Sequence, residues 1–229
     1  MSPFSARLGA VAGWLTLLGL VVGLIIVPAM IAGQEPASAA PPSELRAYFA
    51  HPELAVLNGY LTGFVAVGFV AFGLGLRVIL SAGTDRDHAF ADIGMALLVI
   101  AMGLNLASGA LVATLVDGTS RAGADLVPLA RLHDVTFNGL GDVLEGAWIG
   151  AFSIAMLSGT MPRWIGWYGI VLAVAHLLKA IGPFIALPEM LDQVFGPLIV
   201  IWFLATVVSL TRIAFKGVGS SLTRPAVPA

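Results

Sequence analysis

The stretch that decides the fold is LAVLNGYLTGFVAVGFVAFGLGLRVIL, which runs from Leu54 to Leu80 and carries one charged residue, Arg77. A helix that crosses the hydrocarbon core of a bilayer needs about 20 mostly apolar residues. The stretch meets this requirement, so we predict that it spans a membrane.

The composition of the whole chain supports the same conclusion. Hydrophobic residues make up 59% of the sequence and charged residues 10%, whereas a soluble domain averages roughly 25% charged residues. A chain with so few charges cannot cover a water-facing surface, and lipid must face most of it. We therefore predict an all-α integral membrane protein.

Five further windows have the same apolar character, and polar or Pro-rich segments separate them. The six predicted transmembrane helices lie at about residues 8–32, 54–80, 93–116, 135–158, 164–186 and 194–214. They form one predicted domain, residues 1–216, built as a six-helix bundle. Residues 217–229 are small and Pro-containing, which is typical of a disordered cytoplasmic tail.

The first window resembles a secretory signal, because Arg7 precedes an apolar run and Ala37-Ser38-Ala39 is a small-residue sequence. The apolar region of a signal peptide is about 7–15 residues long. The run from Leu8 to Ala32 is much longer. We therefore expect a retained first span.

The positions of Lys and Arg predict the orientation, because cytoplasmic loops carry an excess of these residues. With both termini in the cytoplasm, that side holds Arg7, Arg77, Arg86, Arg163, Arg212, Lys216 and Arg224. The opposite side holds only Arg46, Arg121 and Arg131. This asymmetry favours a multi-pass protein of the cell membrane with two cytoplasmic termini.

Several functional classes lack the residues they need. The net charge of -2 and the absence of a Lys/Arg run argue against nucleic-acid binding. The absence of cysteine excludes disulfides and thiolate metal sites. The histidines fall on both sides of the membrane, which argues against a zinc site or a haem with two histidine ligands. We predict no catalytic residues, no metal and no identifiable cofactor, which favours a protein that is not an enzyme.

Polar residues gather in the fourth predicted span. It begins with His133 and continues through Asp134, Asn138, Asp142 and Glu145. Steps of four, four and three residues from Asp134 onward place these side chains on one helical face. Because a charge in hydrocarbon costs at least about 2.5–3.5 kcal/mol, that face should point away from lipid.

The fifth span carries His176 and Lys179, which again share a face. Spans joined by a short turn usually pack as antiparallel neighbours. Counted from the turn between them, Glu145 and His176 lie at about the same depth, as do Asp142 and Lys179. We therefore predict a buried cluster that pairs Asp142 with Lys179 and Glu145 with His176.

Other residues could join this cluster, or could have simpler roles. Asn58 and Asn105 lie in the same half of the membrane, and either could contact the cluster or bond neighbouring helices. His133 and Asp134 could instead cap their helix at the interface. Lys179 could extend to the headgroups. The cluster itself could be a ligand or proton site or a structural set of ion pairs.

Short motifs mark the starts of the spans: HPEL at His51–Leu54, LHDVTF at Leu132–Phe137 and PRWIG at Pro162–Gly166. In their order, these motifs resemble the bacterial family of six-span proteins catalogued as domain of unknown function 4386. The resemblance covers nearly the whole chain and implies a six-span protein of the bacterial inner membrane. It implies no activity and no catalytic residues.

Three functions remain open on the sequence alone. The first is binding or transport of a small ligand or proton through the polar cluster. The second is an accessory or scaffold subunit of a larger membrane complex, and the third is a lipid-modifying enzyme that uses Asp142 and Glu145 as acid and base. Membrane lipid is the one expected partner, and either a homo-oligomer or a larger complex is compatible with the sequence.

Overall fold

A computed structural model describes residues 3–22, 40–121, 125–180 and 190–216. All of the regular secondary structure in these ranges is helical. The predicted tail at 217–229 lies outside the described residues, as does the end of the first predicted span. The helices, in chain order, are α1 (Pro3–Val21), α3 (Pro42–Phe49), α4 (Pro52–Leu80), α5 (Asp85–Thr119), α6 (Val127–Asp134), the π-helix η2 (Val135–Gly141), α7 (Asp142–Met156), α8 (Arg163–Ala180) and α10 (Met190–Phe215).

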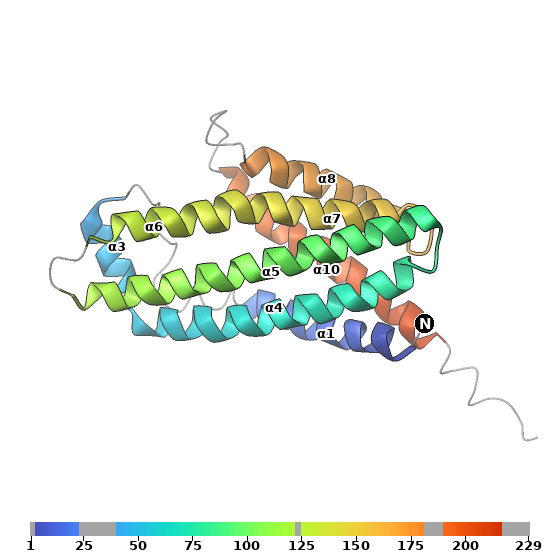
Figure 1. The fold of residues 1–229 in the computed structure, drawn as a ribbon, viewed down its shortest axis with the longest axis horizontal. Coiled ribbons are helices and arrows are strands. Elements are labelled where there is room, and N and C mark those ends of the chain that lie inside the picture. The colour runs from blue at the N-terminus through green and yellow to red at the C-terminus, as the bar shows by residue number, and fades with distance from the viewer. Residues whose placement is uncertain (1–2, 23–39, 122–124, 181–189, 217–229) are drawn as a thin grey trace, which may run out of the picture.

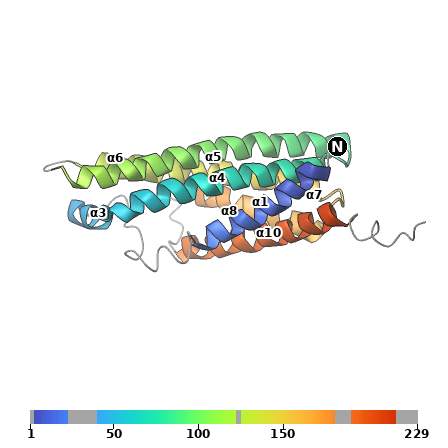
Figure 2. The same cartoon turned by 90° about the horizontal axis from the view of Figure 1, so that it is seen from below.

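The helices form an elongated bundle (Figure 1). The helices α4 and α5 run side by side along its length, and α6, η2 and α7 form one uninterrupted helix that packs against α5. The helices α1, α8 and α10 thicken one half of the bundle, where α1 packs on both α4 and α10 (Figure 2). The short helix α3 lies at the opposite end with α6.

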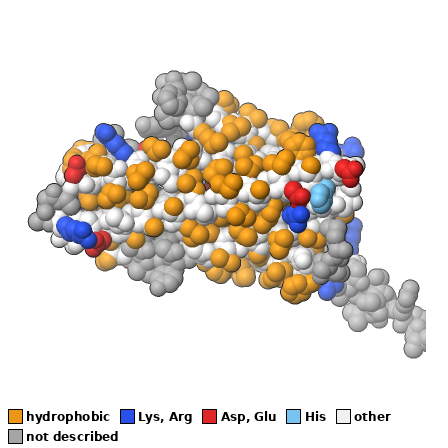
Figure 3. Space-filling model, viewed as in Figure 1, with side chains coloured by type: hydrophobic (Ala, Val, Ile, Leu, Met, Phe, Trp, Pro, Cys, Tyr) orange, Lys and Arg blue, Asp and Glu red, His pale blue; other side chains and the backbone are white. Residues whose placement is uncertain are grey.

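Four helices are long and apolar enough to cross a membrane: Phe4–Val21, Leu61–Leu80, Asp85–Thr119 and Gly196–Phe215. The exposed side chains agree with such an environment, since many large hydrophobic residues face outward. In Figure 3 hydrophobic side chains form a broad band on the visible face, and charged side chains gather toward its two ends. The chain therefore has the character of a helical membrane protein.

The helix α5 begins well before the predicted start of the third span. Thr84 caps it in a capping box, in which the Thr84 side chain accepts a hydrogen bond from the Asp87 backbone and the Asp87 side chain accepts one from the Thr84 backbone. The charged residues 85–92 are thus helical, although they were predicted to lie before the span. The guanidinium Nε of Arg77 lies 2.5 Å from Asp92 Oδ1 and joins the end of α4 to this first part of α5.

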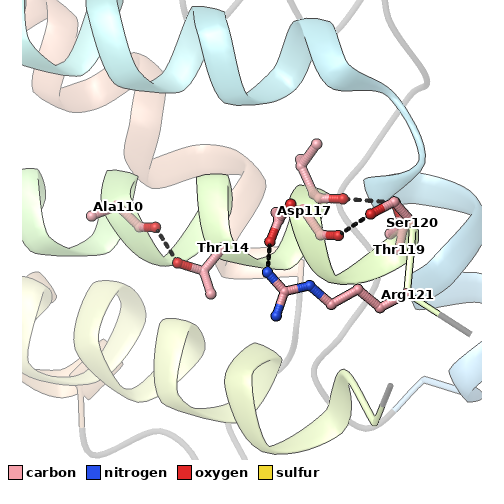
Figure 4. Close-up of polar contacts among 7 residues, drawn as sticks. Ala110, Thr114, Asp117, Thr119, Ser120 and Arg121 are labelled. Carbon is pink, nitrogen blue, oxygen red and sulfur yellow. Dashed lines mark hydrogen bonds and ion pairs between the residues drawn. The ribbon is translucent and has the colours of Figure 1, made fainter. Parts of the chain in front are cut away.

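The opposite end of α5 is closed by local polar contacts (Figure 4). Arg121 lies 2.5 Å from Asp117, and the Ser120 hydroxyl donates to the Asp117 carbonyl. Arg46 of α3 donates to the Thr119 carbonyl at 3.0 Å. The sequence analysis did not predict α3, although Leu45 and Phe49 are one helical turn apart and are both buried.

Two separate apolar cores result. The larger core holds the aromatic residues Phe72, Trp148, Phe152, Trp202 and Phe203, which are all nearly fully buried. The smaller core lies between α3, the end of α5 and α6. The molecule therefore has a main bundle and a small helical extension at one end.

Glycine sets the distance between neighbouring helices at several points. A Cβ built on Gly9 of α1 would lie 2.5 Å from the Cα of Gly75 on α4. Backbones can approach this closely only where both residues lack a side chain. Gly9 and Gly75 therefore allow α1 and α4 to approach closely.

Candidate functional site

The candidate site lies between α7 and α8, which are joined by a tight turn. Gly159 adopts a φ of 98° in this turn, a conformation that glycine enters without steric cost. Its amide donates to the Met156 carbonyl at 3.2 Å. The turn makes α7 and α8 antiparallel neighbours, as the sequence predicted.

A glycine on α7 brings α8 close at the level of the site. A Cβ on Gly146 would lie 2.9 Å from the Ala173 carbonyl oxygen and 3.1 Å from the His176 Cβ. A Cβ on Gly150, one turn away, would lie 3.2 Å from the Ala173 Cβ. Because no larger residue fits at Gly146 without movement of α8, this glycine fixes the spacing across which the polar side chains meet.

Asp142 is the centre of the site. Its Oδ1 lies 3.2 Å from His176 Nδ1, and both residues are buried, with exposed fractions of 5% and 1%. The Lys179 ammonium lies 3.1 Å from Asp142 Oδ2 and 3.3 Å from Oδ1. A single buried carboxylate therefore contacts both the imidazole and the ammonium of α8.

Glu145 completes the cluster. It is half-buried, and one of its carboxylate oxygens lies within 4.8 Å of ligand atoms of both Asp142 and His176. The structure thus brings all four predicted residues together. The pairing differs from the prediction in one respect. We predicted that Asp142 pairs with Lys179 and not with His176, whereas in the structure His176 Nδ1 also contacts Asp142.

The formal charges of this cluster do not balance when the imidazole is neutral. Two ionised carboxylates and one ammonium leave a charge of -1, and one added proton removes it. Because Asp142 and His176 are buried, little solvent is available to offset this charge.

The same side chains offer three potential metal-ligand atoms, from Asp142, Glu145 and His176. The sequence analysis considered histidines for a metal site and did not include this mixed set. However, Lys179 contacts both Asp142 oxygens. A metal cation would have to compete with this ammonium for Asp142.

The π-helix η2 precedes Asp142 directly and corrects one sequence inference. The hydrogen bonds of a π-helix span five residues instead of four. Buried positions in this region accordingly step from Thr136 to Gly141. The spacing of η2 therefore differs from the α-helical spacing used to place Asp134 and Asn138 on one face with Asp142, and that shared face stays a prediction.

His133 lies apart from the cluster, and its partner was not predicted. Its Nδ1 is 2.8 Å from the Ser108 hydroxyl of α5, and its ring stacks on Phe137 at 5.9 Å between centroids. Both members of the His133–Ser108 pair are buried. Ser108 lies in a different predicted span, and nothing in the sequence indicated this contact.

The remaining predicted residues are not placed in the cluster. Asp134 is half-buried on α6. Asn105 is half-buried on α5, and no hydrogen bond joins it to the cluster among the described residues. The side chains of Asn58 and Asn138 lie outside the described part of the structure.

Comparisons with known proteins returned no matching family model, no matching curated protein and no matching solved structure. The resemblance to the six-span family therefore stays a prediction. The argument for function depends on the geometry between α7 and α8.

Proposed function

We propose that this protein is a multi-pass membrane protein that binds a proton at the cluster of Asp142, Glu145, His176 and Lys179. The bound proton is either transported or used in the binding of a small ligand. The observation that carries the proposal is the position of Asp142. It is buried between two helices and lies within hydrogen-bond distance of both His176 and Lys179.

The combination of side chains in the cluster supports proton binding rather than a fixed structural ion pair. One carboxylate and one lysine would balance each other and need no further group. The addition of Glu145 and His176 supplies a second acid and the side chain whose charge changes near neutral pH. Chains of Asp, Glu and His within membranes are typical of proton relays.

We also propose the six-span arrangement with both termini on the cytoplasmic side. The uninterrupted helix from Val127 to Met156 is roughly 45 Å long and α8 is roughly 27 Å long, which compares with a hydrocarbon core of about 30 Å. Arg7 of α1 donates to the Ala214 carbonyl of α10, which supports a common side for the two ends of the chain. The resemblance to bacterial six-span proteins supports the inner membrane as the location.

The test is proton movement in proteoliposomes that contain a pH-sensitive dye. After a potassium gradient with valinomycin sets the membrane potential, we expect internal pH to change faster with the protein than in empty liposomes. The Glu145→Gln variant should return the rate to that of empty liposomes, because it removes the second acid without changing side-chain size.

The matched control is Glu44→Gln, which makes the same change on an exposed residue of α3. It should retain the rate of the unmodified protein. A Glu145→Gln rate equal to that of the unmodified protein would contradict the proposal, as would an unmodified rate equal to that of empty liposomes.

A further inference from the structure

The ends of α1 and α10 form a cationic surface that is separate from the proton site. We infer that Arg7, Arg212 and Lys216, together the α1–α10 patch, bind the phosphate of an anionic phospholipid headgroup. All three residues are exposed. This inference does not depend on the proposed proton function.

Contacts between the two helices bring the patch together. Arg7 Nε donates to the Ala214 carbonyl at 3.4 Å, and the Arg7 guanidinium lies 5.6 Å from the centroid of the Phe215 ring. Trp14 of α1 also donates to the Thr211 hydroxyl at 3.1 Å. The first turns of α1 therefore lie against the last turns of α10, so Arg7 lies beside the part of α10 that carries Arg212 and precedes Lys216.

Within the described ranges, no carboxylate is paired with this patch. Neither α1 nor the segment Gly196–Phe215 of α10 contains an acidic residue. Among the described residues, no ion pair involves Arg7, Arg212 or Lys216. By contrast, the Arg77 side chain is paired with Asp92.

Exposed aromatic residues border the patch and indicate its depth. Phe4 is 69% exposed, Trp14 43% and Phe215 41%. Tryptophan is enriched where headgroups meet acyl chains. A headgroup phosphate above these rings would lie at the level of the cations, and a guanidinium is suited to bind phosphate oxygens through two hydrogen bonds.

The choice of a lipid over soluble phosphate follows from this combination of features. The cations alone could attract any phosphate. The apolar side chains beside them favour a ligand whose phosphate is attached to acyl chains. Anionic lipids attract basic residues near the membrane surface, and each such residue contributes about fivefold in affinity.

The experiment is native mass spectrometry of the full-length protein, released from mild detergent that contains equal amounts of phosphatidylglycerol and phosphatidylcholine. We expect the protein to retain phosphatidylglycerol in preference to phosphatidylcholine. The triple variant Arg7→Gln, Arg212→Gln, Lys216→Gln should lower phosphatidylglycerol retention roughly 100-fold at about fivefold per charge.

The matched control removes three other exposed cations, through Arg86→Gln, Arg131→Gln and Arg163→Gln. It should retain the lipid. The double variant Arg212→Gln, Lys216→Gln preserves the Arg7 contacts between helices and should give a roughly 25-fold loss, which separates binding from misfolding.

Three results would overturn the inference. One is equal retention of phosphatidylglycerol by the triple variant and the unmodified protein. The second is retention of phosphatidylcholine as strong as that of phosphatidylglycerol. The third is displacement of the lipid by millimolar inorganic phosphate, which would show that the patch selects free phosphate.

Discussion

Two carboxylates in this protein each contact two basic side chains, and they differ mainly in burial. Asp142 contacts His176 and Lys179, and its side chain is 7% exposed. Asp92 contacts Arg77 at 2.5 Å and His88 at 3.3 Å, and its side chain is 41% exposed. Because water screens charges at the exposed position, the same chemistry should have different energetic consequences at the two sites.

The comparison explains why only one cluster is proposed as functional. At Asp92, solvent can offset any charge that the side chains leave unbalanced, because this side chain is 41% exposed. At Asp142 the neighbouring side chains must supply that balance. A change of one proton between α7 and α8 is therefore coupled to the packing of those helices.

The largest expected effect comes from Asp142→Asn. This change leaves Lys179 and His176 without their shared carboxylate, and the loss of one partner from a buried pair costs about 3–5 kcal/mol. The free energy of unfolding in mixed detergent micelles would measure it. The double variant Asp142→Asn, Lys179→Met should recover part of the loss, since it removes both charges of the pair. Equal destabilisation by the single and double variants would show that the ion pair does not cause the effect.

A smaller effect is expected when the helices are moved apart without any change of charge. In the Gly146→Ala variant the added methyl group would meet the Ala173 carbonyl and the His176 Cβ, and overpacking typically costs about 1–3 kcal/mol. Unfolding should report this loss. Gly103→Ala is the matched control on α5, because nothing lies within 4 Å of its added Cβ. Comparable losses in the two variants would mean that close packing at Gly146 is not specific to the site.

The smallest effect is expected from Asp92→Asn. An exposed ion pair contributes between 0 and about 1 kcal/mol, and salt screens this contribution. We expect the loss in unfolding free energy to shrink toward zero at high salt, whereas the loss from Asp142→Asn should change little. A similar salt dependence for both variants would remove the distinction between the two clusters.

Much of the helical architecture was predictable, because apolar length is a direct requirement of a bilayer. The four helices that are long and apolar enough to cross a membrane correspond to four of the predicted windows. The start of α5 was not predicted, since the charged segment Gly83–His88 was interpreted as a turn. Local capping by Thr84 and Asp87 instead makes this segment helical.

The candidate site was predictable in its members but not in its contacts. Asp142 and Lys179 lie about the same number of residues from the turn between α7 and α8, so the sequence predicted that they meet. In the structure these two side chains are in contact. Counting does not give side-chain direction, so it did not predict that His176 would contact Asp142. The π-helix η2 was also missed, because the glycines in its VTFNGLG sequence do not distinguish a π-helix from an α-helix.

The π-helix has a further consequence for how the two polar sites relate to each other. Each hydrogen bond in η2 spans five residues, one more than in the α-helices on either side. The rotation of α6 about its axis, relative to α7, therefore depends on η2. If η2 lost its one extra residue and became α-helical, α6 would rotate by about 100° about its axis relative to α7. His133 would then swing away from Ser108 while Asp142 stayed beside His176. The register of η2 therefore sets the direction of His133 toward Ser108, whereas the contact of Asp142 with His176 depends on α7 and α8.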